Sequence, residues 1–333
     1  MKRSCVVAVD AMGGDRAPGE IVAGALSAAE QLDVGILLAG GKDELVALLP
    51  DGGAPDGVEI LPTTEVISMH EDPASVVRTK KDSSIVQCAR AVREGRAQAM
   101  VGAGNTGATM AAGLLRMGRI RGVKRPAIGV PVPAPGRAPQ LLVDGGATVD
   151  CAPEWLVQFA LLGRTYSRVR FGIDEPRVGL LSNGEEPGKG DQLRKETFAL
   201  LDGEPGFVGN VEGRDLFTDS VDVIVTDGFT GNVVVKTIEG ALRSFASTVF
   251  GAFDASHETK RAAEVVTPPL LEAAAPYVPD NTGGAVLLGV DGVCVISHGS
   301  SSAKAIVNAV RVAADAVENR SVDQLKEAIA DAG

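Results

Sequence analysis

The sequence predicts one α/β domain over residues 1–333, built on a mostly parallel sheet with helices on both of its faces. Two observations lead to this fold class. Short apolar runs alternate along the chain with amphipathic stretches of roughly 10 to 18 residues, which is the pattern of repeated βαβ units. The 41 glycines supply the tight turns that so many connections between strands and helices require. A helical hairpin over about 240–280 is the one subregion that the pattern sets apart.

The first half of the chain alternates strands and helices in a regular order. Its opening segment (SCVVAVD) is a continuous apolar run that predicts a buried strand, and Pro18 suits the first turn of the helix that follows. Asp82 or Ser83 can cap a later helix that runs to about Glu94. Strands are expected at 4–10, 35–39, 58–61 and 97–101, and helices at 18–32, 43–49, 82–94 and 109–117.

The second half continues the alternation. The helix that begins near Asn232 has apolar residues at helical spacing, which predicts one buried face. The residues of that face are Val234, Val235, Ile238, Leu242, Phe245, Ala246 and Val249. Strands are expected at 127–132, 140–143, 177–181, 221–226 and 292–296, with further helices at 153–166, after residue 181 and at 300–317.

Composition and charge exclude several classes of function. A formal net charge of −11 and an aromatic content of 4% leave neither the basic stripe nor the stacking platforms of a nucleic-acid-binding protein. Three histidines and four cysteines without a CxxC pair argue against a metal site and a disulfide framework. The opening residues lack the apolar core of a signal peptide, and no apolar run is long enough to span a membrane. We therefore expect a cytoplasmic protein that uses no metal.

Six predicted strands end in segments rich in glycine and small polar residues. Small residues there let backbone N–H groups approach an anion, and the N-terminus of the next helix adds its dipole. We expect these turns to line one anion-binding crevice at an edge of the sheet. The segments are DAMGGDRAPGE (10–20), GAGNTGA (102–108), LVDGGAT (142–148), LLSNGEEPGKGD (180–191), VTDGFTGNVVVK (225–236) and ISHGSSSAKA (296–305). The candidate phosphate- or substrate-binding residues are Asp10, Gly13, Gly14, Asp15, Gly104, Asn105, Thr106, Glu185, His298 and Ser300.

Each of these motifs also has a purely structural explanation. GAGNTGA matches the spacing of the GxGxxG dinucleotide motif, but it follows a later strand and precedes a basic, proline-containing stretch, so a tight turn explains it equally well. Lys189 can be a charge placed for phosphate or for an oxyanion, or an exposed loop lysine. Asn232 can cap its helix, donate to a ligand, or do both. His298 before three serines suggests a hydrolase, but the GxSxG elbow is missing and an anion-binding turn is favoured.

Two stretches offer surfaces for partners. A basic run in this acidic chain fits an acidic protein partner, although a solvated loop explains it as well. Its members are Arg116, Arg119, Arg121, Lys124 and Arg125. The helix at 233–250 and the proline-broken segment at 265–278 can form an exposed hairpin with a membrane-surface or dimer patch, or can simply pack as helices. The apolar residues concerned are Phe250, Phe253, Val265, Val266, Leu270 and Leu271.

Together these motifs resemble those of the phosphate acyltransferase family of bacterial phospholipid synthesis, PlsX. The matching stretches run in the expected order from Cys5 to about Val310, and include VAVDAMGGDRAPGE, VGAGNTGATMAAG, LLVDGGATVDC, VGLLSNGEEPGKGD, VTDGFTGNVVVKT and ISHGSSSAKAI. The resemblance implies a fold like that of isopropylmalate dehydrogenase and of phosphate acetyltransferase, used without a nicotinamide cofactor. It also implies a homodimer with peripheral contact at the inner face of the membrane. The segment PDNTGGA lacks the aromatic residue that many relatives carry there.

The reaction that this resemblance implies is transfer of a long-chain acyl group from an acyl carrier protein to inorganic phosphate, which gives an acyl phosphate for phospholipid synthesis. The family's catalytic residues fall on Lys189 and Asn232 of this chain. Both are expected to orient phosphate or to stabilise the oxyanion of the tetrahedral intermediate. The alternatives are a phosphate acetyltransferase-like enzyme that uses acyl-coenzyme A, a decarboxylating NAD-dependent dehydrogenase, and a non-catalytic membrane scaffold.

Overall fold

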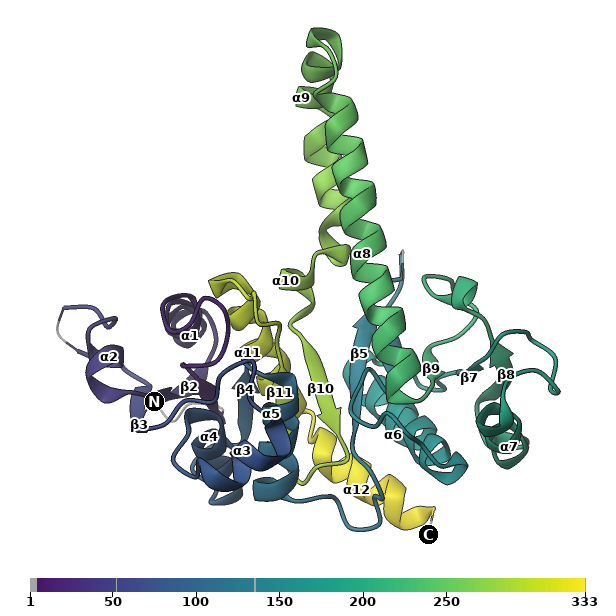
Figure 1. Ribbon diagram of the computed structural model, residues 1–333, viewed down its shortest axis with the longest axis horizontal. Coiled ribbons are helices and arrows are strands. Elements are labelled where there is room, and N and C mark those ends of the chain that lie inside the picture. Colours follow the sequence, from purple (N-terminus) through teal and green to yellow (C-terminus); the bar gives the residue numbers. More distant parts are fainter. Residues whose placement is uncertain (1–4, 52, 135, 333) are drawn as a thin grey trace.

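The computed structural model of the chain describes residues 5–51, 53–134 and 136–332. Its centre is an 11-stranded sheet, and a pair of long helices projects from the body (Figure 1). The strands lie in the order β3-β2-β1-β4-β11-β10-β5-β6-β9-β7-β8. Their bounds are β1 Cys5–Asp10, β2 Val34–Gly40, β3 Val58–Pro62, β4 Ala99–Gly102, β5 Ala127–Val132, β6 Gln140–Val143, β7 Val178–Leu181, β8 Phe207–Val211, β9 Val223–Val225, β10 Ala285–Leu288 and β11 Val293–Ile296.

The sheet is mostly parallel, as predicted, but its two halves run in opposite directions. Strands β1 to β4 and β11 pair in parallel on one side, and β6 to β9 pair in parallel on the other. Between them, β10 pairs antiparallel with both β11 and β5, and β5 pairs antiparallel with β6. The prediction that all the strand-end turns share one edge of the sheet was therefore wrong, because the central antiparallel pairs reverse the chain direction.

Helices cover both faces of the sheet. Helices α1 and α11 pack on one face of the first half, and α4 and α5 pack on the other. Helix α6 covers the second half on the α1 side. The helix bounds are α1 Gly19–Gln31, α2 Lys42–Val46, α3 Pro73–Thr79, α4 Ser84–Arg93, α5 Thr106–Ala112 with a π-helical turn at Gly113–Met117, α6 Pro153–Phe171, α7 Gln192–Leu201, α8 Gly228–Phe253, α9 His257–Ala274, α10 Pro279–Thr282, α11 Ala303–Glu318 and α12 Ser321–Asp331, with 3-10 turns at Gly213–Asp215 and Ala275–Tyr277.

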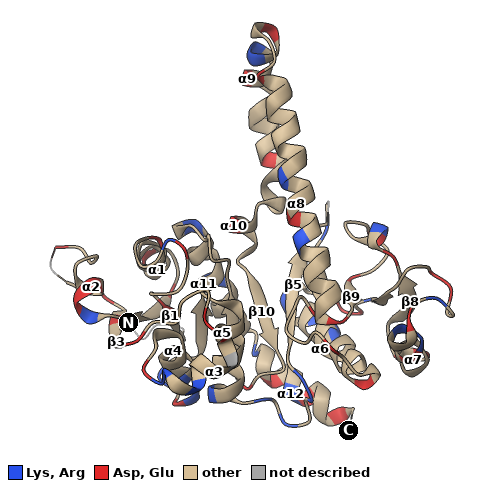
Figure 2. Ribbon diagram, viewed as in Figure 1, with Lys and Arg blue, Asp and Glu red and all other residues tan. Residues whose placement is uncertain are grey.

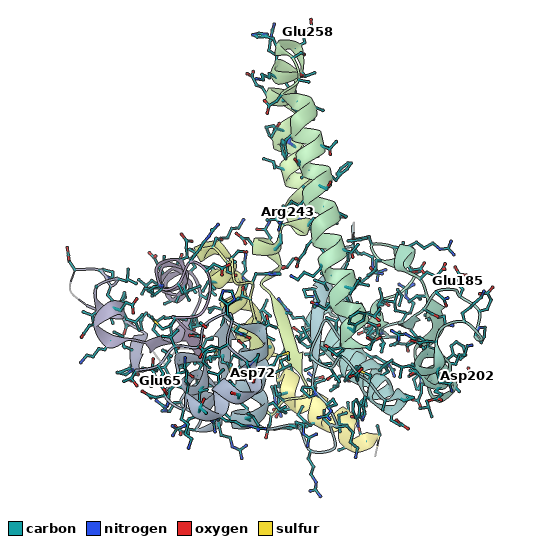
Figure 3. All side chains as sticks on the ribbon, in the orientation of Figure 1. Glu65, Asp72, Glu185, Asp202, Arg243 and Glu258 are labelled. Carbon is teal, nitrogen blue, oxygen red and sulfur yellow. The ribbon has the colours of Figure 1, made fainter. Side chains whose placement is uncertain are left out.

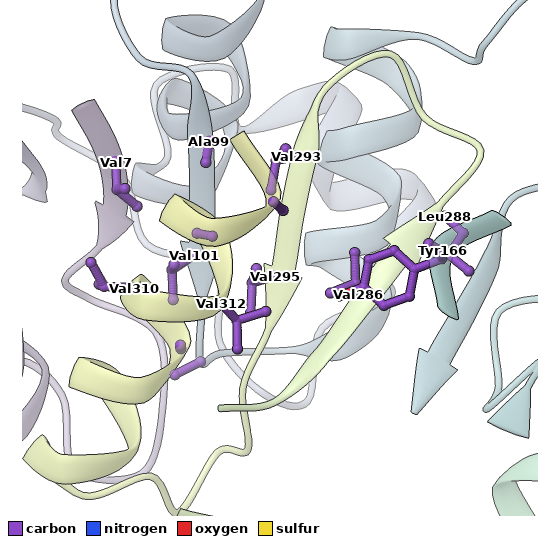
Figure 4. Packing of buried hydrophobic residues seen from close by; sticks show 14 of the residues in the cluster. Val7, Ala99, Val101, Tyr166, Val286, Leu288, Val293, Val295, Val310 and Val312 are labelled. Atoms are coloured by element: carbon purple, nitrogen blue, oxygen red, sulfur yellow. The ribbon is translucent and has the colours of Figure 1, made fainter. Parts of the chain in front are cut away.

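The core follows from alternation along the buried strands. Val7 and Val9 of β1 point to the cluster on the α1 side of the sheet, and Ala8 between them points to the cluster on the α4 side. Small and branched aliphatic residues dominate the first cluster, and Tyr166 is the one aromatic ring labelled among them in Figure 4. Two buried apolar layers, one on each face of the sheet, thus hold the strand ends in position.

Five helices and strands were not expected from the sequence. Helices α3, α10 and α12 and strands β8 and β10 all add to the predicted pattern. The helix predicted at 109–117 begins three residues earlier, at Thr106, and ends as a π-helical turn. The predicted opening strand is present from Cys5, while residue 4 lies outside the described part of the chain.

The hairpin of α8 and α9 stands free of the body along most of its length (Figure 1). The predicted buried face of α8 is only partly correct. Val234, Val235 and Ile238 pack against a small cluster under the helix, whereas Phe245 further along is 70% exposed. Helical spacing showed that α8 has an apolar face, but the described chain supplies a partner only for its first half. Within the described residues, no helix is long and apolar enough to cross a membrane.

Candidate active site

The turns that follow β1, β4 and β11 meet at one place. The backbone N–H of Asp15 donates to Gly299 O at 2.7 Å, which joins the first turn to the last. A Cβ atom on Gly13 would lie 2.9 Å from Gly104 Cα. Gly14 has a φ of +120°, and a Cβ atom there would lie 3.1 Å from the carbonyl oxygens of Ala103 and Gly299. Glycine is needed at these positions because three backbones approach one another so closely.

Two predicted binding residues in these turns already form hydrogen bonds within the protein. Asp10 is 4% exposed, accepts a hydrogen bond from Met12 N at 3.2 Å, and has a pKa that burial raises above its usual range. The Asn105 amide donates to Met69 O and Glu71 O, while its oxygen caps α5 by accepting from Ala108 N at 3.0 Å. Backbone N–H groups and the exposed Thr106 are what this turn offers an anion.

The turn after β11 faces α8. His298 is exposed, and its Nε2 lies 3.7 Å from Glu239 Oε1 on α8. Glu239 also pairs with Lys236 Nζ at 2.9 Å. The exposed Ser300 lies in the same turn, which Ser301 closes by donating to His298 O at 2.6 Å. Helix α8 therefore carries the contact between the first group of turns and the second half of the sheet.

A second group of residues gathers where β6 and β9 end. Asp144 is fully buried and accepts backbone N–H bonds from Ile128, Gly146, Ala147 and Thr148 at 2.7 to 3.0 Å. Burial raises the pKa of Asp144, and these four bonds only partly offset the effect. The carboxylate thus fixes the 144–148 turn as a rigid platform.

Helix α8 begins directly on this platform. A Cβ atom on Gly231 would lie 1.8 Å from Asp144 O, so only glycine lets the helix pack there. The next residue, Asn232, lies against the turn, with its Cβ 3.4 Å from the position of a Cβ on Gly146. Asn232 is exposed, and its amide has no hydrogen-bond partner among the residues that the structure describes.

Asn232 is not the cap of its helix, which corrects one interpretation of the sequence. The N-cap is Asp227, whose side chain accepts from Thr230 N at 2.9 Å, and α8 starts at Gly228. Asn232 lies in the second turn of α8 and is not needed to cap the helix. Its amide is free to donate to a ligand.

Arg194 holds the start of α8, a role that the sequence did not predict. It is 8% exposed on α7, pairs with Asp227, and donates to the hydroxyls of Thr226 and Thr230 at 3.0 Å each. Its other arm pairs with Asp191, the N-cap of α7, at 3.0 Å. Arg194 therefore ties the loop that carries Lys189 to the helix that carries Asn232. A lone arginine in an amphipathic helix gives no sequence signal of this role.

Burial and charge oppose each other at Asp227. Burial by itself would raise the pKa of this carboxyl, but the hydrogen bonds from Thr230 and the charge of Arg194 outweigh it and hold the pKa below its usual range. Asp227 is therefore ionised in the folded protein near neutral pH.

Lys189 and Glu185 lie on the loop after β7. Lys189 is half-exposed, and its Nζ is 4.0 Å from Glu186 Oε2, a distance too long for a hydrogen bond. Glu185, labelled on this loop in Figure 3, pairs instead with Arg214 Nη2 at 2.8 Å. Lys189 is adjacent to Gly190, where a Cβ atom would lie 2.5 Å from Arg194 Cβ. The lysine thus presents a loosely held positive charge on a loop whose base is fixed.

The predicted residues therefore form two groups. Turns with Gly13, Gly14, Asp15, Gly104, His298 and Ser300 make the first, and the platform with Asn232 and the loop of Lys189 makes the second. Seven residues of α8, or about 10 Å of helix, separate Asn232 from Glu239 at the first group. Glycine-rich turns with backbone N–H groups, the free amide of Asn232 and the loosely paired Lys189 suit an oxyanion ligand. In the described chain, no group of three or more His, Cys, Asp or Glu is placed to hold a metal ion.

Comparison with known proteins places this chain among acyl-transfer proteins. A family model described as "Fatty acid synthesis protein" matches residues 5–324. The chain is 47% identical over 323 residues to a phosphate acyltransferase of Desulfitobacterium hafniense strain Y51, with 96% of each chain covered. It is 46% identical over 328 residues to a phosphate acyltransferase of Halothermothrix orenii, with 97% of this chain and 98% of that protein covered.

Solved structures share the fold at much lower identity. A phosphotransacetylase from Streptococcus pyogenes matches with a TM-score of 0.62, 15% identity and 94% of each chain covered. A branched-chain phosphotransacylase from Enterococcus faecalis V583 matches with a TM-score of 0.59, 16% identity and coverage of 94% of this chain and 99% of that one. A 4-hydroxythreonine-4-phosphate dehydrogenase from Klebsiella pneumoniae gives 0.52 at 12% identity, with 93% and 98% covered. The predicted likeness to acetyltransferase and dehydrogenase folds is confirmed.

Proposed function

We propose a donor, a site and a mechanism for this chain, which belongs to the fatty acid synthesis protein family and transfers an acyl group to phosphate. The proposed donor is a long-chain fatty acyl thioester of an acyl carrier protein. The product is an acyl phosphate, a mixed anhydride that can acylate an alcohol in phospholipid synthesis. The enzyme works in the cytoplasm without a metal or a cofactor.

The observation that carries the proposed site is the free amide of Asn232 on a rigid support. The Asp144 platform and the Arg194 network fix the start of α8 from two sides. An exposed amide held this way can donate to an oxyanion without reorganising when charge develops. Lys189, on the loop that Arg194 anchors, supplies the positive charge that a phosphate dianion needs in a protein of net charge −11.

The mechanism requires positioning more than covalent chemistry. A phosphate oxygen attacks the thioester carbonyl carbon, a tetrahedral oxyanion forms, and the C–S bond breaks to release the carrier thiolate. Because phosphate is the nucleophile, no acyl-enzyme is needed, and holding the two reactants together supplies the main entropic advantage. Asn232 and Lys189 orient phosphate or stabilise the oxyanion, and each is expected to contribute about 3 kcal/mol. The turns with His298 and Ser300 extend the binding surface along α8.

The hairpin supports two further parts of the proposal. Its exposed apolar side chains, Phe245, Val265 and Leu271 among them, would be covered in a homodimer or against the surface of a membrane. Figure 2 shows that much of its shaft carries no charged residue. We therefore propose that the chain forms a homodimer and makes peripheral contact with the inner face of the membrane.

One experiment tests the donor and the reaction together. Purified protein is mixed with palmitoyl-carrier protein and labelled phosphate, and the products are examined for an acid anhydride that hydroxylamine cleaves. The proposal predicts labelled acyl phosphate and free carrier protein in equal amounts. Turnover with acetyl-coenzyme A but not with the palmitoyl carrier would favour an acetyltransferase, and reduction of NAD with a hydroxy acid would favour a dehydrogenase.

The Lys189→Ala variant tests the site in the same assay. Near wild-type turnover of a normally folded Lys189→Ala protein would remove Lys189 from the mechanism. The matched control is Lys195→Ala, which removes an exposed lysine from the neighbouring helix α7. This control should leave turnover unchanged.

A further inference from the structure

A cluster of positive charge lies on the loop between the π-helical turn and β5. The basic loop, residues 119–125, carries four exposed cations in a chain of net charge −11. They are Arg119, Arg121, Lys124 and Arg125. Within the described residues, none of the four is in an ion pair with a carboxylate. Their charge is therefore available to an outside partner.

The basic loop has a defined shape despite its exposure. Arg119 donates to Lys124 O across the loop, and the Arg125 guanidinium lies 4.8 Å from the centre of the Trp155 ring. Lys124 N donates to Gln158 Oε1 at 2.9 Å, which anchors the loop to α6. Asp291 lies next to Val290, which bridges to Arg119, but it is already paired with Lys326 at 2.6 Å. Because the loop backbone and the guanidinium groups of Arg119 and Arg125 are held in place, binding costs less entropy than it would for a mobile loop.

The basic loop leads directly into the candidate active site. The residue after it, Pro126, accepts from Thr148 Oγ1 at 3.3 Å. Thr148 in turn accepts at its backbone oxygen from Gly228 N, the first residue of α8, at 2.8 Å. Val149, the residue after this turn, is 56% exposed. A partner seated on the basic loop therefore lies beside the platform that carries Asn232.

The basic loop lies at the opposite end of the molecule from the hairpin tip. A Cβ atom on Gly122 would lie 2.8 Å from Ile329 of α12, and Figure 1 shows α12 at the end away from α9. Figure 2 shows lysine and arginine along this same end of the body. A membrane that contacted the hairpin would leave the basic loop free. This separation favours an acidic protein as its partner over an anionic membrane.

We propose that the basic loop is the docking surface for an acidic carrier protein, which delivers its acyl thioester on a flexible arm to the Asn232 platform. This inference rests on the proposed function. Charges at the rim of such an interface act mainly on the rate of association and on its dependence on salt. The loop therefore sets recognition of the carrier, while the chemistry stays with the residues of the platform and of the Lys189 loop.

The test compares two variants that change net charge equally. Arg121→Glu with Lys124→Glu reverses the basic loop, and Lys42→Glu with Arg311→Glu reverses two exposed cations on α2 and α11. Each protein is assayed with palmitoyl-carrier protein and with palmitoyl-N-acetylcysteamine, an uncharged small thioester. The loop variant should have a roughly tenfold higher KM for the carrier donor, and this KM should no longer depend on ionic strength. Its kcat/KM for the small thioester should stay unchanged. The control pair should match the wild type with both donors.

Several outcomes would overturn the proposal. An unchanged KM for the carrier donor would exclude the loop as its docking surface, as would equal loss with both donors in a protein of normal Tm. Loss of binding to vesicles of phosphatidylglycerol with normal carrier kinetics would assign the loop to a membrane. If charge reversal lowers Tm, Arg121→Gln with Lys124→Gln gives the same comparison. A wild type that uses only the small thioester would overturn the carrier as donor and this docking surface together.

Discussion

Replacement of Arg194 by methionine should destabilise the protein strongly, because the change leaves a buried carboxylate without its partner. Asp227 is 5% exposed and Arg194 is 8% exposed, so their pair is buried. Removal of one member of a buried pair typically costs about 3 to 5 kcal/mol. The second arm of Arg194 adds little, because Asp191 is largely exposed. We therefore expect the free energy of unfolding to fall by about 4 kcal/mol.

Urea denaturation followed by circular dichroism gives the free energy of unfolding and its m-value for each variant. Arg214→Met is the matched control, since Arg214 also pairs with two carboxylates, Glu185 and Glu212, but is 71% exposed. This control should not change the unfolding midpoint measurably. The free energy of unfolding of Arg194→Lys should lie between those of Arg194→Met and Arg214→Met, because an ammonium keeps the charge but cannot reach all of the arginine's acceptors. An Arg194→Met protein as stable as Arg214→Met would refute the role given to the network.

The remaining predictions concern the platform and pH. Gly231→Ala should disrupt the start of α8, because its Cβ would lie 1.8 Å from Asp144 O. Gly240→Ala, on the exposed part of α8, should instead stabilise the protein by about 0.5 to 1 kcal/mol. Thermal unfolding should therefore give a lower Tm for the first variant and a higher Tm for the second. Asp144→Asn should lower the free energy of unfolding by about 1 to 3 kcal/mol, because the amide nitrogen would face a backbone N–H. Equal stability of wild type and variant in urea would contradict this. For Asp222, burial alone would raise the pKa, but Arg177 and Arg137 hold it below its usual range. Its contribution is therefore present above about pH 4 and lost as pH falls through the folded pKa, so Asp222→Asn should flatten the acid limb of a stability–pH curve.

The sequence predicted most strands and helices of this fold, but not how the two halves are joined. The alternation of apolar runs reports local burial, so strands β1 and β4 could be predicted from the sequence. The antiparallel placement of β10 depends on non-local pairing, which its short apolar run AVLL after two glycines does not encode. Edge strand β8 contains glycine and asparagine, which disfavour strands, and its partner β7 holds it in place. The opposite directions of the two halves follow from the antiparallel pairings of β10 with β11 and β5 and of β5 with β6.

The candidate site shows the same division between local and non-local information. Glycine turns, Lys189 and Asn232 were candidates because of their residue types and positions after strands, but only the family resemblance predicted a catalytic role for the last two. Arg194 was not a candidate, because its role depends on Asp227, 33 residues away in the chain. Periodicity also predicted a buried face for the whole of α8, but it could not show that the body covers only the first half of the helix.

The role of Asn232 is tested most directly by the turnover of Asn232→Asp with palmitoyl-carrier protein and phosphate. The substitution keeps the size of a side chain that is exposed and does not cap its helix, so the unfolding midpoint should match that of the wild type. It replaces a donor with an acceptor beside the phosphate, and kcat should fall by about 100- to 1,000-fold. A stable Asn232→Asp enzyme with wild-type kcat would contradict the claim that this amide binds the reacting oxyanion.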